Sequence, residues 1–244
     1  MNGTHKRVRT YAHRNRVTLL SVIAGLGTLL AVALSAPAHA SGGLVSDSNY
    51  GPVMSGRAFG VGLSNIRVLG VTVPDGATPD TGLISTTGSS TNSQPCGNIP
   101  AGTVSATLLC PLVTTNAETY TAKADQTVAT AHVGLAGIPA IDAVAIEAHS
   151  KSSCYGGSSG STTIAYLKVG PTVVISKPTD IRPNTTVNLG VIQLVLNEQI
   201  PSGARNGTGM TVNAIHVKVN ALGLATADVV VSSAQSGVAN CYVD

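Results

Sequence analysis

One short motif in the sequence could carry nucleophilic chemistry. Ser158 lies at the centre of a Gly-x-Ser-x-Gly pattern at 156–160, and Asp180 and His216 follow it in the chain order of α/β-hydrolase triads. In those enzymes the serine occupies a strained turn between a strand and a helix, beside backbone N–H groups that stabilise an oxyanion. Here the β-forming run 163–169 follows instead, and Gly-Gly-Ser-Ser-Gly is typical of a flexible hairpin tip. We therefore predict that Ser158 is not a nucleophile and that the chain is not an enzyme.

The histidines after residue 40 could bring imidazole ligands together in a sheet protein. None stands at a diagnostic spacing from another and there is no Cys-x-x-Cys pair, so we predict no zinc site and expect outward-facing, solvated side chains. Glu147 and His149 stand two residues apart on one face of a predicted strand, a spacing that suits a hydrogen bond. The histidines concerned are His132, His149 and His216.

Residues 74–100 form a polar, turn-rich stretch that we predict to be a long loop. Within it, Thr-Pro-Asp-Thr-Gly at 78–82 resembles a sortase sorting signal with Thr in place of the first Leu. A working signal needs an apolar segment and a basic tail after it, whereas Pro-Asp-Thr-Gly is ordinary turn chemistry, which we favour. Asp75 and Asp80 could hold a weak Ca²⁺ site, but no further ligand supports one. We predict no metal and no cofactor.

The first forty residues have the three parts of a secretory signal peptide. Five cations and no acid lie within 1–16, an uncharged, mostly apolar run covers 17–34, and Ala-His-Ala at 38–40 provides a cleavage site. A retained membrane anchor is the alternative, because eighteen residues can just span a bilayer, but Pro37 and the Ala-x-Ala end favour cleavage. We therefore expect 41–244 to be a single β domain that is secreted or associated with the cell wall and has no membrane partner.

Charge and composition limit the classes of binding partner. The whole chain has fourteen Lys and Arg and eleven Asp and Glu, but five of the cations belong to the leader. Residues 41–244 therefore carry nine cations and a net charge of −2, which leaves no basic patch for nucleic acid. The chain has no Trp and one Phe, so it is poor in the aromatic rings on which sugar-binding modules stack their ligands.

All four cysteines lie after the leader, and an even number in an exported chain predicts two disulfides. Cys96 and Cys110 flank a short segment that ends in a predicted strand, so we expect them to close a local loop. Cys154 and Cys241, each placed after a predicted strand, would then form the second bond. Four cysteines allow three pairings, so the sequence leaves two other pairings open.

Alternating apolar and polar residues, bounded by Gly, Pro and Asn, predict about nine or ten strands, and helical periodicity is weak throughout. A core of Val, Ile, Leu and Ala suits a pleated sheet. Short strands with turn signals between them predict an all-β, antiparallel sandwich or flattened barrel. In the clearest strand, 143–151, we expect Val144, Ile146 and Ala148 to face the core and Glu147, His149 and Lys151 to face solvent. The predicted strands are 59–73 (bent or divided), 103–109, 119–124, 126–133, 143–151, 163–169, 173–176, 186–198, 210–219 and 227–233.

Two segments near the C-terminus carry a family resemblance. They are Gly-Met-Thr-Val-Asn-Ala-Ile-His-Val at 209–217 and Ala-Asp-Val-Val-Val-Ser-Ser-Ala at 227–234, the second followed by Cys241. They resemble the last third of choice-of-anchor P proteins, which are exported proteins mostly of Gram-positive actinobacteria. The strand at 143–154 and the Gly-rich hairpin after it also resemble that family. The resemblance implies a surface or secreted β domain with no known activity. Unlike the anchored members, this sequence has no hydrophobic tail after Cys241, so we expect no C-terminal anchor.

Three classes of function are compatible with such a domain. We favour a noncatalytic structural or interaction module that contacts a cell-wall or other extracellular partner through sheet edges and the 74–100 stretch. A secreted serine hydrolase using Ser158 is one alternative, but the motif lacks its structural context. A carbohydrate-binding module is the other alternative, but the sequence is poor in aromatic residues.

Overall fold

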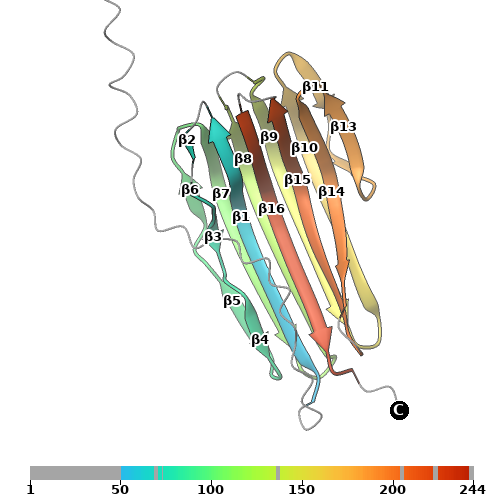
Figure 1. The fold of residues 1–244 in the computed structure, drawn as a ribbon. Coiled ribbons are helices and arrows are strands. Elements are labelled where there is room, and N and C mark those ends of the chain that lie inside the picture. Colours follow the sequence, from blue (N-terminus) through green and yellow to red (C-terminus); the bar gives the residue numbers. More distant parts are fainter. Residues whose placement is uncertain are drawn as a thin grey trace, which may run out of the picture. The chain divides into compact units, whose positions relative to one another are not determined.

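Two antiparallel sheets stack face to face in the computed structural model, which describes residues 51–68, 71–72, 74–135, 138–203, 206–221 and 225–241 (Figure 1). These residues contain sixteen strands and no helix, so the predicted all-β class is confirmed, and the arrangement is a sandwich. The predicted signal peptide at 1–40 lies outside the described residues.

Sheet A is built from both ends of the described chain. Its strand order is β13–β14–β15–β16–β1–β2, with β3 and β4 also paired to β1. The first long strand therefore lies beside the last, with Val53 opposite Ala239. The strands are β1 (Val53–Val68), β2 (Val71–Thr72), β3 (Gly76–Asp80), β4 (Ile84–Thr86), β13 (Thr185–Leu189), β14 (Ile192–Ser202), β15 (Thr208–Ala221) and β16 (Ala225–Ala239).

Sheet B is formed by the middle of the chain. Its order is β11–β10–β9–β8–β7–β5, so four long strands follow one another as a meander, with β12 also paired to β10 and β6 to β7. The strands are β5 (Ser90–Ser93), β6 (Gly97–Ile99), β7 (Val104–Asn116), β8 (Thr121–Val133), β9 (Ile141–Ser153), β10 (Gly157–Val169), β11 (Thr172–Ile175) and β12 (Thr179–Asp180).

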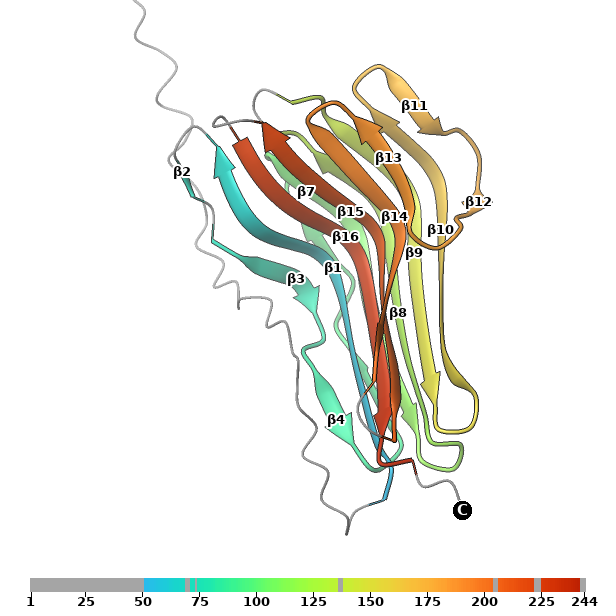
Figure 2. The same ribbon diagram turned by 45° about the vertical axis from the view of Figure 1, so that its right-hand side comes forward.

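Short strands cover the outer long strand of each sheet. On one side β3 and β4 pair with β1 while β5 and β6 pair with β7 (Figure 1). On the other side β11 and β12 pair with β10 while β13 pairs with β14 (Figure 2). The stretch 74–100, predicted to be a loop, therefore contains four short strands, which are part of the reason why the structure has sixteen strands where nine or ten were predicted. Their Ser, Thr and Gly residues give no apolar alternation. Short edge strands offer few free backbone groups for pairing with another chain.

At one level of the sandwich, the residues that face the core switch from odd to even positions, or the reverse, in the long strands of both sheets. We call this level the transverse line. In β9, Ala143 is buried before the line and Ile146 after it, while Val144 and Ala145 between them are both exposed. Pairing with β8 continues in the same register on both sides of the line. Residues with φ between 47° and 61° mark the line in alternate strands, and they are Leu108 in β7, Ala145 in β9, Asn197 in β14 and Ser232 in β16.

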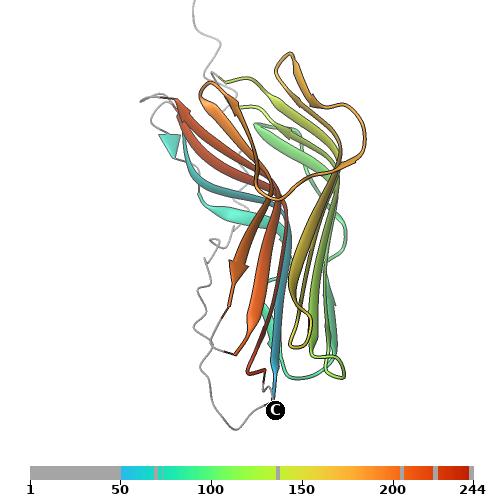
Figure 3. The same ribbon diagram turned by 90° about the vertical axis from the view of Figure 1, so that its right-hand side faces the viewer.

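The change in parity corrects one prediction. Val144 was expected in the core with Ile146 and Ala148, but its side chain is 41% exposed while Ile146 and Ala148 are fully buried. The strict period of two assumes extended backbone throughout, and Ala145, at φ 47°, breaks it without shifting the register of β9 against its neighbours. The strands bend at the same level, as Figure 3 shows.

The line divides the sandwich into two halves, which differ in the residues that face inward. The aliphatic half comprises 61–68, 104–107, 130–133, 141–144, 166–169, 192–196, 215–221 and 225–231. The small-residue half comprises 53–60, 109–116, 121–128, 146–153, 157–164, 198–202, 208–214 and 232–239.

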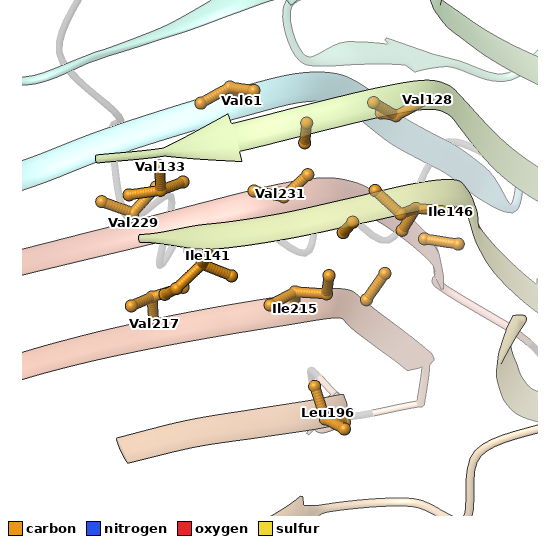
Figure 4. Close-up of a cluster of buried hydrophobic side chains, with 14 of the residues drawn as sticks. Val61, Val128, Val133, Ile141, Ile146, Leu196, Ile215, Val217, Val229 and Val231 are labelled. Atoms are coloured by element: carbon orange, nitrogen blue, oxygen red, sulfur yellow. The ribbon is translucent and has the colours of Figure 1, made fainter. Parts of the chain in front are cut away.

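The aliphatic half is filled by branched side chains. Ile215 and Val217 of β15 lie against Ile141 of β9, with Val229 and Val231 beside them (Figure 4). All five side chains are at most 3% exposed. The ribbons of the two sheets diverge in this half and run closer together in the other (Figure 3), because large side chains need the wider spacing.

In the small-residue half, side chains of one sheet fit against glycines of the other. A Cβ placed on Gly60 of β1 would lie 2.1 Å from Leu109 Cδ2 of β7, so only glycine allows this approach. The same arrangement joins Gly56 to Val113 and Gly160 to Val212, with distances of 2.5 and 2.3 Å. Leu109 and Val113 thus fill the space that a side chain on β1 would take.

Buried serines also connect the two sheets in this half. Ser150 Oγ of β9 donates to the Met210 carbonyl at 2.8 Å and lies 2.7 Å from Ser236 Oγ of β16. Ser152 Oγ lies 2.8 Å from the same Ser236 Oγ. The three serines are at most 2% exposed. Hydrogen bonds between buried side chains therefore link the two sheets in this half, whereas apolar contacts link them in the aliphatic half.

Both predicted disulfide pairings are confirmed. Cys96–Cys110 joins the residue before β6 to β7, with a separation of 14 residues. Cys154–Cys241 joins the turn after β9 of sheet B to the chain just after β16 of sheet A, with a separation of 87 residues. Cys241 packs against Met54, Ala122 and Val238 and closes the end of the small-residue half.

Candidate functional site

Each of the three histidines pairs with a carboxylate on a neighbouring strand. His132 Nδ1 lies 2.6 Å from Asp142 Oδ1, and His149 Nδ1 lies 2.7 Å from Asp125 Oδ1, both on the outer face of sheet B. These two imidazoles are 42% exposed, in line with the expected outward-facing orientation. His216 differs, because its side chain is only 12% exposed.

His216 of β15 lies between two carboxylates from the strands on either side. Its Nδ1 lies 2.6 Å from Glu198 Oε2 of β14, and its Nε2 bonds to Asp228 of β16. Asn213 Nδ2 donates to the same Glu198 oxygen at 2.8 Å, and Ser233 Oγ donates to Asn213 Oδ1 at 2.7 Å. We call these five residues the His216 cluster.

The surroundings shift the pKa of both central partners. Burial by itself would lower the pKa of His216, but the hydrogen bonds to Asp228 and Glu198 outweigh it and raise the pKa to about 9. Burial would raise the pKa of Glu198, but hydrogen bonds from His216 and Asn213 lower the pKa to about 2. At neutral pH the cluster therefore holds an imidazolium between carboxylates.

The His216 cluster is assembled across the transverse line, where the strands bend. Glu198, Asn213 and Ser233 stand directly opposite one another in the small-residue half, while His216 and Asp228 belong to the aliphatic half. Asn197, at φ 49°, precedes Glu198 and resets the face on which that carboxylate lies. The cluster therefore joins the two halves across the bend on the outer face of sheet A.

The chemistry open to the His216 cluster is limited by its own contacts. A general base needs an unprotonated nitrogen near the reacting group, and both nitrogens of His216 are directed at carboxylates. Among the described residues, no group of three or more His, Cys, Asp and Glu side chains is arranged to hold a metal ion. The cluster is suited to fixing the bend by ion pairs and hydrogen bonds.

The residues of the Gly-x-Ser-x-Gly hypothesis are not brought together. Ser158 lies in β10 opposite Ser152, and this strand continues without interruption to Val169. Asp180 accepts a hydrogen bond from Thr163 at 3.2 Å, about 16 Å along β10 from Ser158. His216 lies in the other sheet. A strand therefore occupies the place where the hydrolase motif requires a helix.

The sorting-signal-like segment at 78–82 is tied to β1. Arg57 Nε donates to Asp80 Oδ1 at 3.0 Å, and the same oxygen accepts the Gly82 N–H at 2.8 Å. Thr81 is buried, and its Oγ1 accepts the Ala58 N–H at 3.0 Å. Asp75, in the same stretch, accepts the Asn65 N–H at 3.0 Å. Both aspartates considered for calcium thus bond to groups of β1, consistent with a structural role for this turn.

A shallow hollow lies on the outer face of sheet B in the small-residue half. It has a volume of about 470 Å³ and is lined by four threonines, Asn116, Lys123 and Lys151. A second hollow of about 390 Å³ shares the two lysines and extends past His149 to Ser159 and Ser161. We call the first the lysine hollow, and its lining threonines are Thr114, Thr115, Thr119 and Thr121.

Sequence reasoning missed both surfaces. Glu198, Asn213 and Asp228 were not singled out, and neither were Lys123 and Lys151 as a pair. Each set meets only through strand pairing between distant segments, so a single sequence offers no spacing that would reveal it.

Comparison with known proteins identifies no relative of this chain. No family model, no curated protein and no solved structure matches the chain. Within the described ranges, none of the secondary structure is a helix long and apolar enough to cross a membrane.

Proposed function

We propose that residues 41–244 form a noncatalytic interaction module that acts outside the cell, as a secreted or cell-wall-associated protein. The observation that carries this proposal is the closed bonding of His216, whose two ring nitrogens both face carboxylates while Ser158 lies in the other sheet. A serine hydrolase needs a nucleophile within hydrogen-bonding reach of an available base.

Two features support an extracellular location. The disulfides Cys96–Cys110 and Cys154–Cys241 persist in oxidising compartments and are rare in the cytosol. The leader at 1–40 has the composition of an export signal.

Membership of the choice-of-anchor P family is part of the proposal. The resembling segments 209–217 and 227–234 lie in β15 and β16, which pair with each other, and Cys241 fixes the chain just beyond them. They thus form one continuous piece of sheet A, which is consistent with a shared structural unit.

Labelling with a fluorophosphonate probe tests the noncatalytic assignment. Purified protein and the Ser158→Ala variant should show equal, negligible labelling and no turnover of a panel of short-chain esters. Labelling of the wild type that disappears in Ser158→Ala would establish the hydrolase instead.

Fractionation of the native culture tests the location. The secreted or wall-bound protein should begin Ser41-Gly42-Gly43 by N-terminal sequencing, because cleavage is expected after Ala40. Recovery of the intact chain from the membrane fraction would contradict the proposal.

A further inference from the structure

Two lysines face each other at the centre of the lysine hollow. Lys123 of β8 stands directly opposite Lys151 of β9, both are exposed, and neither has an ion-pair partner in the described part of the chain. Like charges directly opposite each other destabilise a sheet. An anion between them would remove that repulsion, so the pair favours a negatively charged ligand.

The lining of the hollow suits a hydroxylated ligand as well. The hydroxyls of Thr114 and Thr119 have no partner within the described residues, and neither does the amide nitrogen of Asn116. No acid lines this hollow among the described residues. In the adjoining hollow the one lining acid, Asp125, is held by His149 at 2.7 Å.

An aromatic pair lies at the same end of the strands. Tyr120 stands between Thr119 and Thr121, which both line the lysine hollow, and its ring centroid is 6.2 Å from that of Tyr155. Tyr155 is 77% exposed, and the adjacent Cys154–Cys241 bond fixes its turn. Exposed tyrosine rings stack on the apolar faces of sugars. The sequence alone gave no reason to expect two tyrosines together in a chain poor in aromatic residues.

We propose that the lysine hollow and the Tyr120–Tyr155 pair bind an anionic polysaccharide, a sugar chain that carries carboxylate or phosphate groups. The lysines bind the anionic group, the threonines and Asn116 bind sugar hydroxyls, and Tyr155 stacks on a neighbouring ring. This assignment rests on the proposed interaction function and names the class of its partner.

Isothermal titration with three soluble probes tests the proposal. Oligogalacturonate presents carboxylates on sugars, a phosphorylated mannan presents phosphates on sugars, and maltoheptaose is an uncharged sugar chain. Binding of either charged sugar, weakened at high salt, with no binding of maltoheptaose is the expected result. The charged probe that binds identifies the anionic group. Equal binding of maltoheptaose, or binding of no probe, would overturn the proposal.

Variants locate the site on the protein. Lys123→Gln and Lys151→Gln should each lower the affinity about tenfold, because each removes a charge-assisted contact. Tyr155→Ala should lower the affinity at all salt concentrations, because stacking is not screened. Lys177→Gln, the same charge change outside both hollows, is the matched control and should bind like the wild type. Binding unaffected by Lys123→Gln and Lys151→Gln would overturn the assignment of this site.

Sodium polyphosphate separates sugar recognition from charge alone. Polyphosphate should bind more weakly than the charged sugar chain does, and Tyr155→Ala should not change the affinity for polyphosphate. Tighter binding of polyphosphate than of the charged sugar chain would show that the site does not recognise sugar. Chromatography of the bound oligosaccharide should recover it intact. Cleavage products would contradict the noncatalytic function while leaving the binding site supported, so the two failures are distinguishable.

Discussion

The two halves of the sandwich are held together by different means. In the aliphatic half, Ile215, Val217 and their neighbours bury large apolar side chains between diverging sheets. In the small-residue half, glycines admit Leu109 and Val113, buried serines bond across the sheets, and a disulfide closes the end. The difference shows that one sandwich can combine apolar burial with close backbone approach, each where the sheet spacing allows it.

Apolar burial contributes about 25 cal/mol per Å² removed from water, so small residues gain less from it. The small-residue half therefore depends more on geometry and on covalent linkage than the aliphatic half does.

Removal of the inter-sheet disulfide should have the largest effect. We expect Cys154→Ala/Cys241→Ala to lower the free energy of unfolding by about 4.5 kcal/mol, because this bond closes a long loop. Cys96→Ala/Cys110→Ala, the matched control, should cost about 3 kcal/mol, because its loop is short. Urea unfolding under non-oxidising conditions measures both. A larger loss from the short loop would contradict the role given to Cys154–Cys241.

Truncation of a large side chain should weaken the aliphatic half strongly. Ile215→Ala should lower the free energy of unfolding by about 3.5 kcal/mol, since the side chain is 1% exposed and its removal leaves a cavity. Ile200→Ala, at a position 47% exposed, is the control and should cost less than about 1 kcal/mol. Similar losses for the two variants in urea unfolding would show that this half does not rely on burial.

Addition of one methyl group should weaken the small-residue half. Gly60→Ala should cost about 2.5 kcal/mol, because the new Cβ would overlap Leu109. Gly51→Ala, where the added Cβ meets no atom within 4 Å, should leave stability nearly unchanged. The double variant Gly60→Ala/Leu109→Ala should lose less than the sum of the single losses, because the second change removes the overlap. Additive losses in urea unfolding would rule out the fit between these two residues.

The His216 cluster, which joins the halves, should have the smallest effect and a defined dependence on pH. Because the pKa of His216 is raised to about 9, its stabilisation should be complete below pH 6.5 and be lost as the pH rises to 9. The lowered pKa of Glu198 gives stabilisation above pH 4.5 that is lost as the pH falls towards 2. We expect a change of about 1 kcal/mol on the alkaline side, since Asp228 is partly exposed and solvent screens the pair.

Thermal unfolding across this range measures the effect of the cluster. The alkaline loss should be absent in His216→Gln and present in His132→Gln, the matched control at an exposed pair. An unchanged alkaline loss in His216→Gln would show that another group is responsible.

The class of fold and the short-range disulfide could be predicted because they depend on local signals, and the pairing of Cys154 with Cys241 then followed by elimination. Strand residues alternate within each segment, and Cys96 and Cys110 are near neighbours in sequence. Val144 was misplaced because Ala145 adopts a positive φ that no local residue type announces. The short strands within 74–100 were missed because they exist only by pairing with β1 and β7.

The candidate surfaces could not be predicted for a related reason. Lys123 and Lys151 meet through the pairing of β8 with β9, and the His216 cluster requires three strands in register. Periodicity assigns a residue to one face of a strand, but which residues stand opposite each other depends on turn geometry and on the bend.

The pairing of β1 with β16 has a consequence for the order of folding. Residues 104–169 can form the four central strands of sheet B as soon as they are made, because each strand pairs with the next. Sheet A cannot close until Ala239 exists, since that residue lies opposite Val53. Contacts so distant in sequence form late and slowly. The growing chain is therefore kept from its native state until its last strand has been synthesised, whereas sheet B can begin to form before sheet A.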